Sequence, residues 1–189
     1  MLEELRAEIE SLLKEGLFDS AWTLCSFLVA SSKQKHPHAK QTQTGQQLEA
    51  RDWTLFGDAA FGMEDFAQAL GFYEKALMLL RSHGHEEKST YPMLLRAADC
   101  NLKLKDYKAA ADYLKAVPFD SRPLRHSLAL ARLYERWGKR KNAILAYQEV
   151  VDKTKGRLVV SAAIALARLG ATSKAVAAVG GGGGGGDKI

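Results

Sequence analysis

The chain has 189 residues, of which 47% are hydrophobic and 26% are charged, a balance typical of a folded protein with a hydrophobic core. This composition argues against a collagen-like, membrane or wholly disordered protein. The net charge of +5 is unevenly spread, since residues 1–90 hold 9 Lys and Arg against 14 Asp and Glu, whereas residues 91–189 hold 18 against 8. We therefore expect the acidic and basic parts to face different partners.

The N-terminus predicts no export and no membrane insertion. Residues 1–10, MLEELRAEIE, are acidic and amphipathic and lack the basic start and apolar centre of a secretory signal. No run of about 18 apolar residues occurs anywhere in the chain. We expect a soluble, intracellular protein with no membrane partner.

The first elements form a predicted helix pair over about residues 2–30. Helical spacing of apolar residues runs from Leu2 to Leu13, and Gly16 interrupts it. The next segment, Asp19 to Ala30, is apolar on most of its faces, more than an end helix facing water tolerates. We therefore predict a self-association surface here, with Leu17, Phe18, Trp22 and Phe27 as its candidate residues. Residues 31–47 lack periodicity and apolar content, and predict a polar loop.

The clearest repeat runs from Trp53 to Leu79. Trp53, Phe56 and Gly57 fall on one helical face, a turn follows at residues 63–65, and Tyr73 lies on a second apolar-periodic segment. This order is the tetratricopeptide (TPR) signature of a helical hairpin. It places the second hairpin at about residues 48–81, followed by a polar loop at residues 81–89.

Two later segments repeat the pattern, at about residues 90–118 and 122–155. In the first of them, Pro92 is compatible with an opening helical turn. Aligning the turns superposes three sets of positions, spaced by 41 and then 33 residues, close to the roughly 34 residues of a TPR unit. The sets are Gly57, Ala98 and Ala131; Ala69, Ala110 and Ala143; and Tyr73, Leu114 and Tyr147.

The physical reason for the pattern is steric. Antiparallel helices approach to about 8–10 Å only if small residues lie where their axes cross. Gly57, Ala69 and Ala76 supply the small residues of the second hairpin, and Trp53, Phe56 and Tyr73 fill the space beside them. Because one hairpin cannot bury both its faces, we predict an all-α fold of about five TPR-type hairpins, at residues 1–179, stacked in a right-handed superhelix.

The fifth hairpin, at about residues 157–179, is predicted to be incomplete. Ala163 and Ala175 take the small positions, but a glycine tract begins at Gly180. Glycine is about 1 kcal/mol worse than Ala per helical residue, so residues 180–189 predict a disordered tail. A repeat array needs a polar cap at its end. We expect either a piece of a longer array, which we favour, or an open last repeat that docks onto another protein.

The sequence predicts no catalytic, cofactor or metal site. It contains no Walker loop, no zinc-type cysteine pairs and no nucleophile elbow. Cys25 and Cys100 lie within apolar helical patterns and predict buried free thiols. The pairs His36 and His38, and His83 and His85, lie in polar loops and predict solvated side chains rather than metal ligands.

Charged residues on the first helices of the later hairpins leave two interpretations open. Arg125, Arg132 and Arg136 lie near one helical face, and Asp99 and Lys103 take similar positions one repeat earlier. We favour a solvated face over a groove for an acidic or extended peptide. The basic half lacks the interleaved aromatic residues of single-strand binders, so we expect no nucleic-acid partner.

A more specific resemblance rests on segments that the TPR consensus does not require. These are GLFDSAWTLCSFLVASS at residues 16–32 and IALARLGATSKAV at residues 164–176, with a variable loop, TPR hairpins and the AVP of residues 116–118 between them. In this order the chain resembles the N-terminal half of the subunit-seven proteins of the anaphase-promoting complex, the cyclosome. The similarity extends to Val179.

The resemblance implies a non-catalytic scaffold in a ubiquitin ligase that marks mitotic regulators for destruction, found in nucleus and cytoplasm. It implies homodimers formed through the N-terminal repeats and stacking on the other TPR subunits of the complex. The alternative is a generic TPR adaptor, or a co-chaperone that clamps an acidic C-terminus in its groove. Thr54 and Asp58 at the groove positions argue against such a clamp, because an Asp repels a carboxylate.

Overall fold

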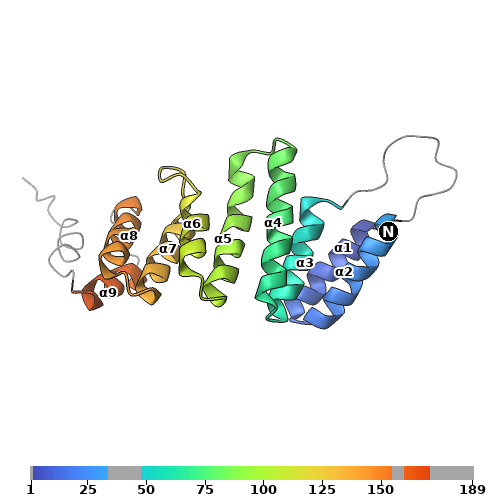
Figure 1. The fold of residues 1–189 in the computed structure, drawn as a ribbon, viewed down its shortest axis with the longest axis horizontal. Coiled ribbons are helices and arrows are strands. Elements are labelled where there is room, and N and C mark those ends of the chain that lie inside the picture. The colour runs from blue at the N-terminus through green and yellow to red at the C-terminus, as the bar shows by residue number, and fades with distance from the viewer. Residues whose placement is uncertain (1, 34–47, 155–159, 171–189) are drawn as a thin grey trace, which may run out of the picture. The chain divides into compact units, whose positions relative to one another are not determined.

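The structure, a computed structural model, describes residues 2–33, 48–154 and 160–170. Within these ranges the regular secondary structure is nine α-helices, which confirms the predicted all-α class (Figure 1). The residues form two compact units, one ending at Asp106 and one beginning at Tyr107. The first unit holds α1 (Leu2–Glu15), α2 (Phe18–Lys33), α3 (Ala50–Gly62), α4 (Phe66–Ser82) and α5 (Glu87–Lys103). The second holds α6 (Tyr107–Lys115), α7 (Leu124–Arg136), α8 (Arg140–Lys153) and α9 (Val160–Arg168).

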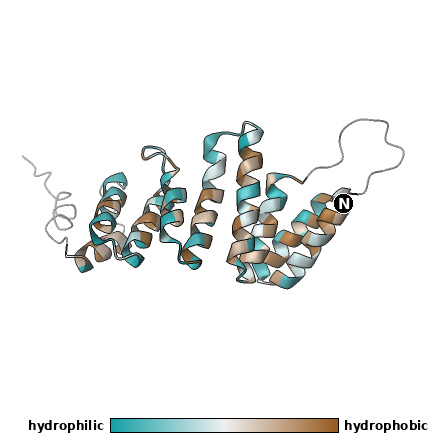
Figure 2. Cartoon of the chain, viewed as in Figure 1, coloured by the Kyte–Doolittle hydropathy of each residue, from teal (hydrophilic) through white to brown (hydrophobic). Residues whose placement is uncertain are grey.

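In each unit, consecutive helices pack against one another. In the first unit α1 packs on α2 and α3, and α3, α4 and α5 follow in series; in the second, α6 to α9 do the same. The helices carry both hydrophobic and hydrophilic residues (Figure 2). The core of the first three helices is built on Ile9, Ala21, Cys25, Leu28, Leu55, Phe56 and Ala59. None of the helices in the described ranges is long and apolar enough to cross a bilayer.

One left-handed residue makes each turn between the paired helices. Gly16, Glu64, Lys105 and Gly138 all have φ between 64° and 76°. The N–H of the next residue then donates to the carbonyl five residues earlier, as from Asp65 to Ala60 at 2.9 Å. This is the Schellman geometry that ends a helix. At the second turn Asp65 also caps α4, because its Oδ1 accepts the Gln68 N–H at 3.0 Å.

The positions predicted to pack the hairpins are buried, apart from the half-buried Trp53. Gly57 lies so close to α4 that a Cβ built on it would overlap the Tyr73 ring. The other positions are at most 5% exposed: Phe56, Ala69, Tyr73, Ala76, Ala98, Ala110, Leu114, Ala131, Ala143 and Tyr147. In the fifth predicted hairpin, the buried residues of α9 are Ala162, Ala165 and Leu166, whereas Ala163 is only half-buried.

Two predicted loop boundaries are wrong. Helix α2 continues to Lys33, three residues into the predicted loop, and α5 begins at Glu87 rather than near Pro92. Pro92 lies inside α5. Two side-chain hydroxyl groups stabilise the helical turn before it, because Ser89 donates to the Glu86 carbonyl and Thr90 to the Glu87 carbonyl, both at 2.6 Å. The rest of the first loop, Ala175 and the tail at residues 180–189 lie outside the described residues.

The small positions can be tested with two glycines. We expect Gly57→Ala to lower the free energy of unfolding, because the new methyl overlaps Tyr73. Gly71→Ala, on α4, should raise it by about 1 kcal/mol, because nothing lies within 4 Å of the added Cβ and Ala is the better helix former. Ala69→Leu and Ala110→Leu should each cost about 1–3 kcal/mol through overpacking. Urea unfolding measures all four, and equal effects of the two glycine variants would contradict the packing described.

The turns give a second test. Glu64→Gly and Lys105→Gly should each stabilise the protein by up to about 1 kcal/mol, because a side chain is strained at positive φ. Gly138→Ala should destabilise it by about 1 kcal/mol for the same reason. Thermal melts of the single variants check both directions. A Glu64→Gly protein that melts below the unmodified chain would contradict the left-handed turn.

Candidate functional site

A cleft with a volume of about 580 Å³ lies on the first unit, on the first helices of its hairpins. Each of α1, α3 and α5 contributes side chains to its wall, and α2 and α4 add one each. The lining residues are Glu10, Leu13, Lys14, Phe18, Arg51, Thr54, Leu55, Asp58, Phe61, Gly62, Tyr73, Arg96 and Asp99. Its volume is within the range of sites that hold small ligands or a few residues of a peptide.

Asp58 is the central polar residue of this cleft. The Tyr73 hydroxyl donates to its Oδ1 at 2.8 Å, and Arg96 forms an ion pair with the same carboxylate. Burial raises the pKa of Tyr73 well above its ordinary value, so the phenol stays a neutral donor. These contacts join α3, α4 and α5. Because Asp58 already has a cation, it repels an incoming carboxylate less than the sequence predicted.

The remaining charges of the cleft are nearly balanced. Arg51 donates to Glu10 Oε1 at 2.7 Å, so this pair also neutralises itself. Lys14 and Asp99 add one charge of each sign. A charge-balanced wall discriminates little between acidic and basic ligands. Shape and apolar contact with Phe18, Leu55 and Phe61 are therefore the main selective features of this cleft.

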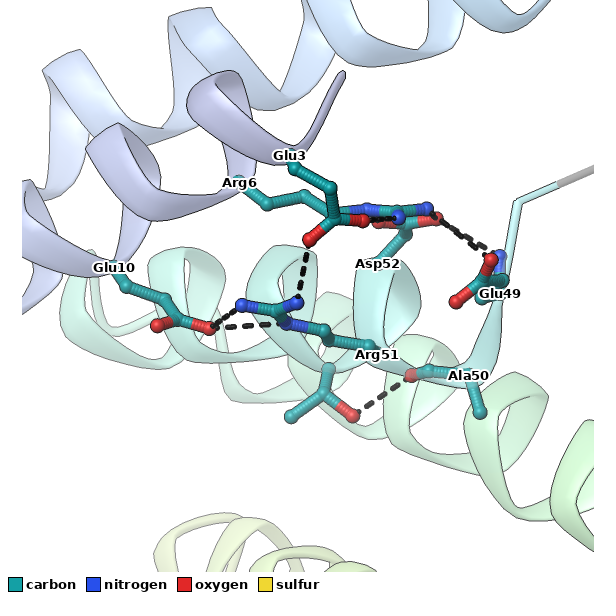
Figure 3. A network of polar contacts seen from close by, with 8 residues as sticks. Glu3, Arg6, Glu10, Glu49, Ala50, Arg51 and Asp52 are labelled. Carbon is teal, nitrogen blue, oxygen red and sulfur yellow. Dashed lines mark hydrogen bonds and ion pairs between the residues drawn. The ribbon is translucent and has the colours of Figure 1, made fainter. Parts of the chain in front are cut away.

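A buried ion pair beside the cleft joins the first hairpin to the second (Figure 3). Arg6 on α1 donates through Nε to Asp52 Oδ1 at 2.6 Å and through Nη2 to Oδ2 at 2.8 Å. Asp52 is fully buried, and its Oδ2 also accepts the Glu49 N–H at 2.8 Å, at the start of α3. The carboxylate thus holds α1 and caps α3 at once. Such a bidentate pair fixes orientation as well as contact.

The second unit repeats the tyrosine link. Tyr147, which the alignment equates with Tyr73, donates to Glu135 Oε2 at 2.8 Å, and Glu135 pairs with Arg168 of α9. Burial, followed by the hydrogen bond to Glu135, raises the pKa of Tyr147 to about 12. The same arrangement therefore occurs in both units. A tyrosine on the second helix of a hairpin donates a hydrogen bond to a carboxylate on the first helix, and that carboxylate pairs with an arginine of the next hairpin.

A separate network ties α8 to the start of α7. Glu149 accepts from Ser127 at 2.8 Å and pairs with Lys153 at 2.9 Å and Arg122 at 3.3 Å. Burial disfavours its carboxylate, but the hydrogen bonds from Lys153 and Ser127 and the charge of Arg122 outweigh it and lower the pKa of Glu149. Arg122 also donates to the Val117 carbonyl at 2.9 Å.

The four residues proposed for self-association divide into two groups. Phe18 packs against Gly62 and lines the cleft, and Trp22 makes ring contacts at 5.9 Å with Phe56 and with Phe72. These two side chains are half-buried within the chain. Leu17 and Phe27 are instead 48% and 59% exposed, so they offer more apolar surface to a partner than the other two.

The residues proposed for the groove do not lie together in one site. Asp99 lines the cleft, as do the groove positions Thr54 and Asp58. Lys103 does not, and its ammonium lies 5.4 Å from the centre of the Phe66 ring. Arg125, Arg132 and Arg136 are all exposed on α7 and belong to the second unit.

The cysteines have the environment that the sequence predicted. Cys25 and Cys100 are buried and free, and burial raises the pKa of each thiol to about 12. The rings of His83 and His85 lie 6.3 Å apart. Within the described ranges no group of three or more His, Cys, Asp or Glu is placed to hold a metal ion, and His36 and His38 lie outside those ranges.

Sequence reasoning missed Arg6, Asp52 and Arg96. A signal for the first was available, because Arg6 falls within the apolar stripe of Leu2, Leu5, Ile9 and Leu13. A charged residue in such a stripe requires a partner, since an unpaired buried charge is costly. No local pattern identifies Asp52 as that partner or joins Arg96 to Asp58.

Two curated proteins match the sequence over most of its length. One, from Dictyostelium discoideum, is 29% identical over 80% of this chain, and one from Arabidopsis thaliana is 26% identical over 92%. Both are named anaphase-promoting complex subunit 7. The chain is similar to subunit 7 of the anaphase-promoting complex. It spans 27% and 33% of the length of these two relatives, and no family model matches it.

Solved structures show the fold. A Podosopora anserina putative kinesin light chain with TPR-like repeats has a TM-score of 0.67 at 16% identity, and covers 94% of this chain and 91% of its own. MamA from Desulfovibrio magneticus RS-1 has a TM-score of 0.65 at 18% identity, with coverage of 94% and 90%. The TPR-type fold predicted from the hairpin pattern is therefore confirmed.

The buried pair predicts a large and asymmetric mutational effect. Asp52→Asn should lower the free energy of unfolding by about 3–5 kcal/mol, because it removes the buried counter-charge of Arg6 and leaves only the exposed carboxylates of Glu3 and Glu49. The double variant Arg6→Met with Asp52→Leu should lose less than this single one, because neither charge is then buried alone. Arg51→Met, which removes a more exposed pair, should cost under about 1 kcal/mol. Denaturant unfolding measures the three, and a double variant that loses as much stability as Asp52→Asn, or more, would contradict the coupling.

Proposed function

We propose that this chain is a non-catalytic TPR scaffold segment of the anaphase-promoting complex, the cell-cycle ubiquitin ligase. Its task is assembly, through contacts with other TPR subunits and with a second copy of itself, in the nucleus and cytoplasm. The similarity to two proteins named as subunit 7 of that complex carries this proposal. The TPR-type fold supports it, because stacked hairpins offer extended surfaces for protein partners.

Self-association is the finer part of the proposal, and the outer face of α2 supports it. Between Asp19 and Lys33 this helix contains no charged residue. Phe27 is 59% exposed there, with Thr23 and Ala30 exposed one turn on either side. An exposed aromatic on a face of small uncharged residues suits a symmetric contact with a second copy.

Complex membership is tested by affinity purification. The tagged chain, expressed in cells whose complex carries a second tag on another subunit, should co-purify the ligase. Asp52→Asn serves as the control that weakens the fold itself. Recovery of chaperones without any subunit of the ligase would overturn the scaffold proposal.

Self-association is tested by light scattering of the full chain over a range of concentrations. We expect a mass that rises toward a dimer, and Phe27→Glu should shift the protein to monomer because it places a charge in the apolar contact. Leu145→Glu is the matched control, since Leu145 is 71% exposed on α8. A chain that is monomeric at all concentrations, or equal effects of both variants, would exclude the α2 contact.

The cleft supports a second candidate function, a TPR adaptor or co-chaperone that binds an extended peptide. Its volume of about 580 Å³ and its apolar residues Phe18, Leu55 and Phe61 suit a peptide side chain. The pairing of Asp58 with Arg96 removes part of the electrostatic objection to an acidic terminus. Purified chaperone C-terminal peptides that bind the chain, and compete with no ligase subunit, would favour this alternative.

A further inference from the structure

Helix α7 carries a straight row of three arginines, Arg125, Arg132 and Arg136. At 100° per residue these positions fall within a stripe about 40° wide and about 16 Å long. All three side chains are exposed, and the opposite face of α7 buries His126, Leu130, Leu133 and Tyr134, among others. The arginine row therefore lies on the solvent face of the helix.

The arginines of this row are not used to hold the fold. Among the described residues, none of these three side chains forms a hydrogen bond or ion pair, whereas the side chains of neighbouring arginines do. Arg122 pairs with Glu149 and Arg168 pairs with Glu135. Arg140 donates to the Leu169 carbonyl at 2.7 Å.

Two features of the row are electrostatically unfavourable for the free helix. Arg132 and Arg136 are four residues apart, where like charges repel across one helical turn. Arg125 lies in the first turn of α7, where the helix dipole disfavours a cation. No acidic residue lies on the same stripe. An anionic partner relieves both effects at once.

The repeat alignment places the row on the helix face that lines the cleft in the first unit. The alignment of Gly57 with Ala131 equates Arg125 with Arg51 and Arg132 with Asp58. Arg51 and Asp58 both line the cleft of the first unit. The second unit therefore presents an arginine where the first presents a neutralised carboxylate.

We propose that the arginine row of α7 binds an acidic segment of a partner protein. Guanidinium groups match carboxylates in a bidentate geometry, and three in a row select closely spaced acids. A protein segment fits better than a nucleic acid, because the nearby Trp137 is already stacked with Tyr107 and Tyr134 and has the Lys139 ammonium 3.6 Å from its ring centre. The Trp137 ring is thus already packed within the fold, and its face is not open for stacking on a nucleic-acid base.

The test uses the full chain and a fluorescein-labelled oligoglutamate of about ten residues, twice the extended length of the row. Fluorescence anisotropy should show binding that weakens as salt rises from about 0.05 to about 0.5 M. The variant R125Q/R132Q/R136Q should bind at least about tenfold more weakly, since three ion pairs are lost. Its melting temperature should not fall, because the row repels itself in the free protein. The control K108Q/K115Q/K141Q removes the same charge elsewhere in the second unit and should change binding by less than about threefold.

Three results would overturn the proposal. The first is equal weakening by the row variant and the control, which would show that only net charge matters. The second is tighter binding of a labelled oligothymidylate of matched charge than of oligoglutamate, lost in the row variant, which would assign the row to nucleic acid. The third is loss of self-association in the row variant by light scattering, which would assign the row to a second copy of the chain.

Discussion

The close approach of paired helices is the constraint on which the rest of this structure depends. Gly57 leaves no room for a Cβ beside Tyr73, and Ala69, on the same helix as Tyr73, is fully buried. With this spacing the ring of Tyr73 packs against Gly57, and its hydroxyl donates to Asp58. A larger residue at either position would separate the helices and break that hydrogen bond. The hydrogen bond between Tyr73 and Asp58 therefore depends on the small residues that let the two helices approach.

Polar side chains then join the first hairpin to the second, the second to the third and the fourth to the fifth. Asp58 pairs with Arg96 of the following helix, and Glu135 pairs with Arg168 in the same way. The first junction uses a fully buried pair, Arg6 with Asp52. Apolar packing is tolerant of small sliding movements, whereas a bidentate pair is not, so the Arg6–Asp52 contact fixes the register between the first two hairpins.

The two units use equivalent helix faces for different chemistry. In the first unit the face lines a cleft whose charges are paired with one another, as Glu10 is with Arg51. In the second unit the face of α7 displays arginines that have no partner among the described residues. A repeat fold permits this difference, because the positions that build the hairpin are buried and those that face a ligand are free to change.

The sequence by itself determined the helical class and the buried small positions of the second to fourth hairpins, since both are periodic and local. It also indicated buried cysteines. Only the tertiary structure decided that Trp22 and Phe18 pack internally, that Pro92 lies within α5, and that Arg6 meets Asp52, 46 residues away. Periodicity shows which face of a helix is buried, but the partner of a side chain depends on how the helices pack. That packing is fixed by contacts between distant segments, which no local pattern encodes.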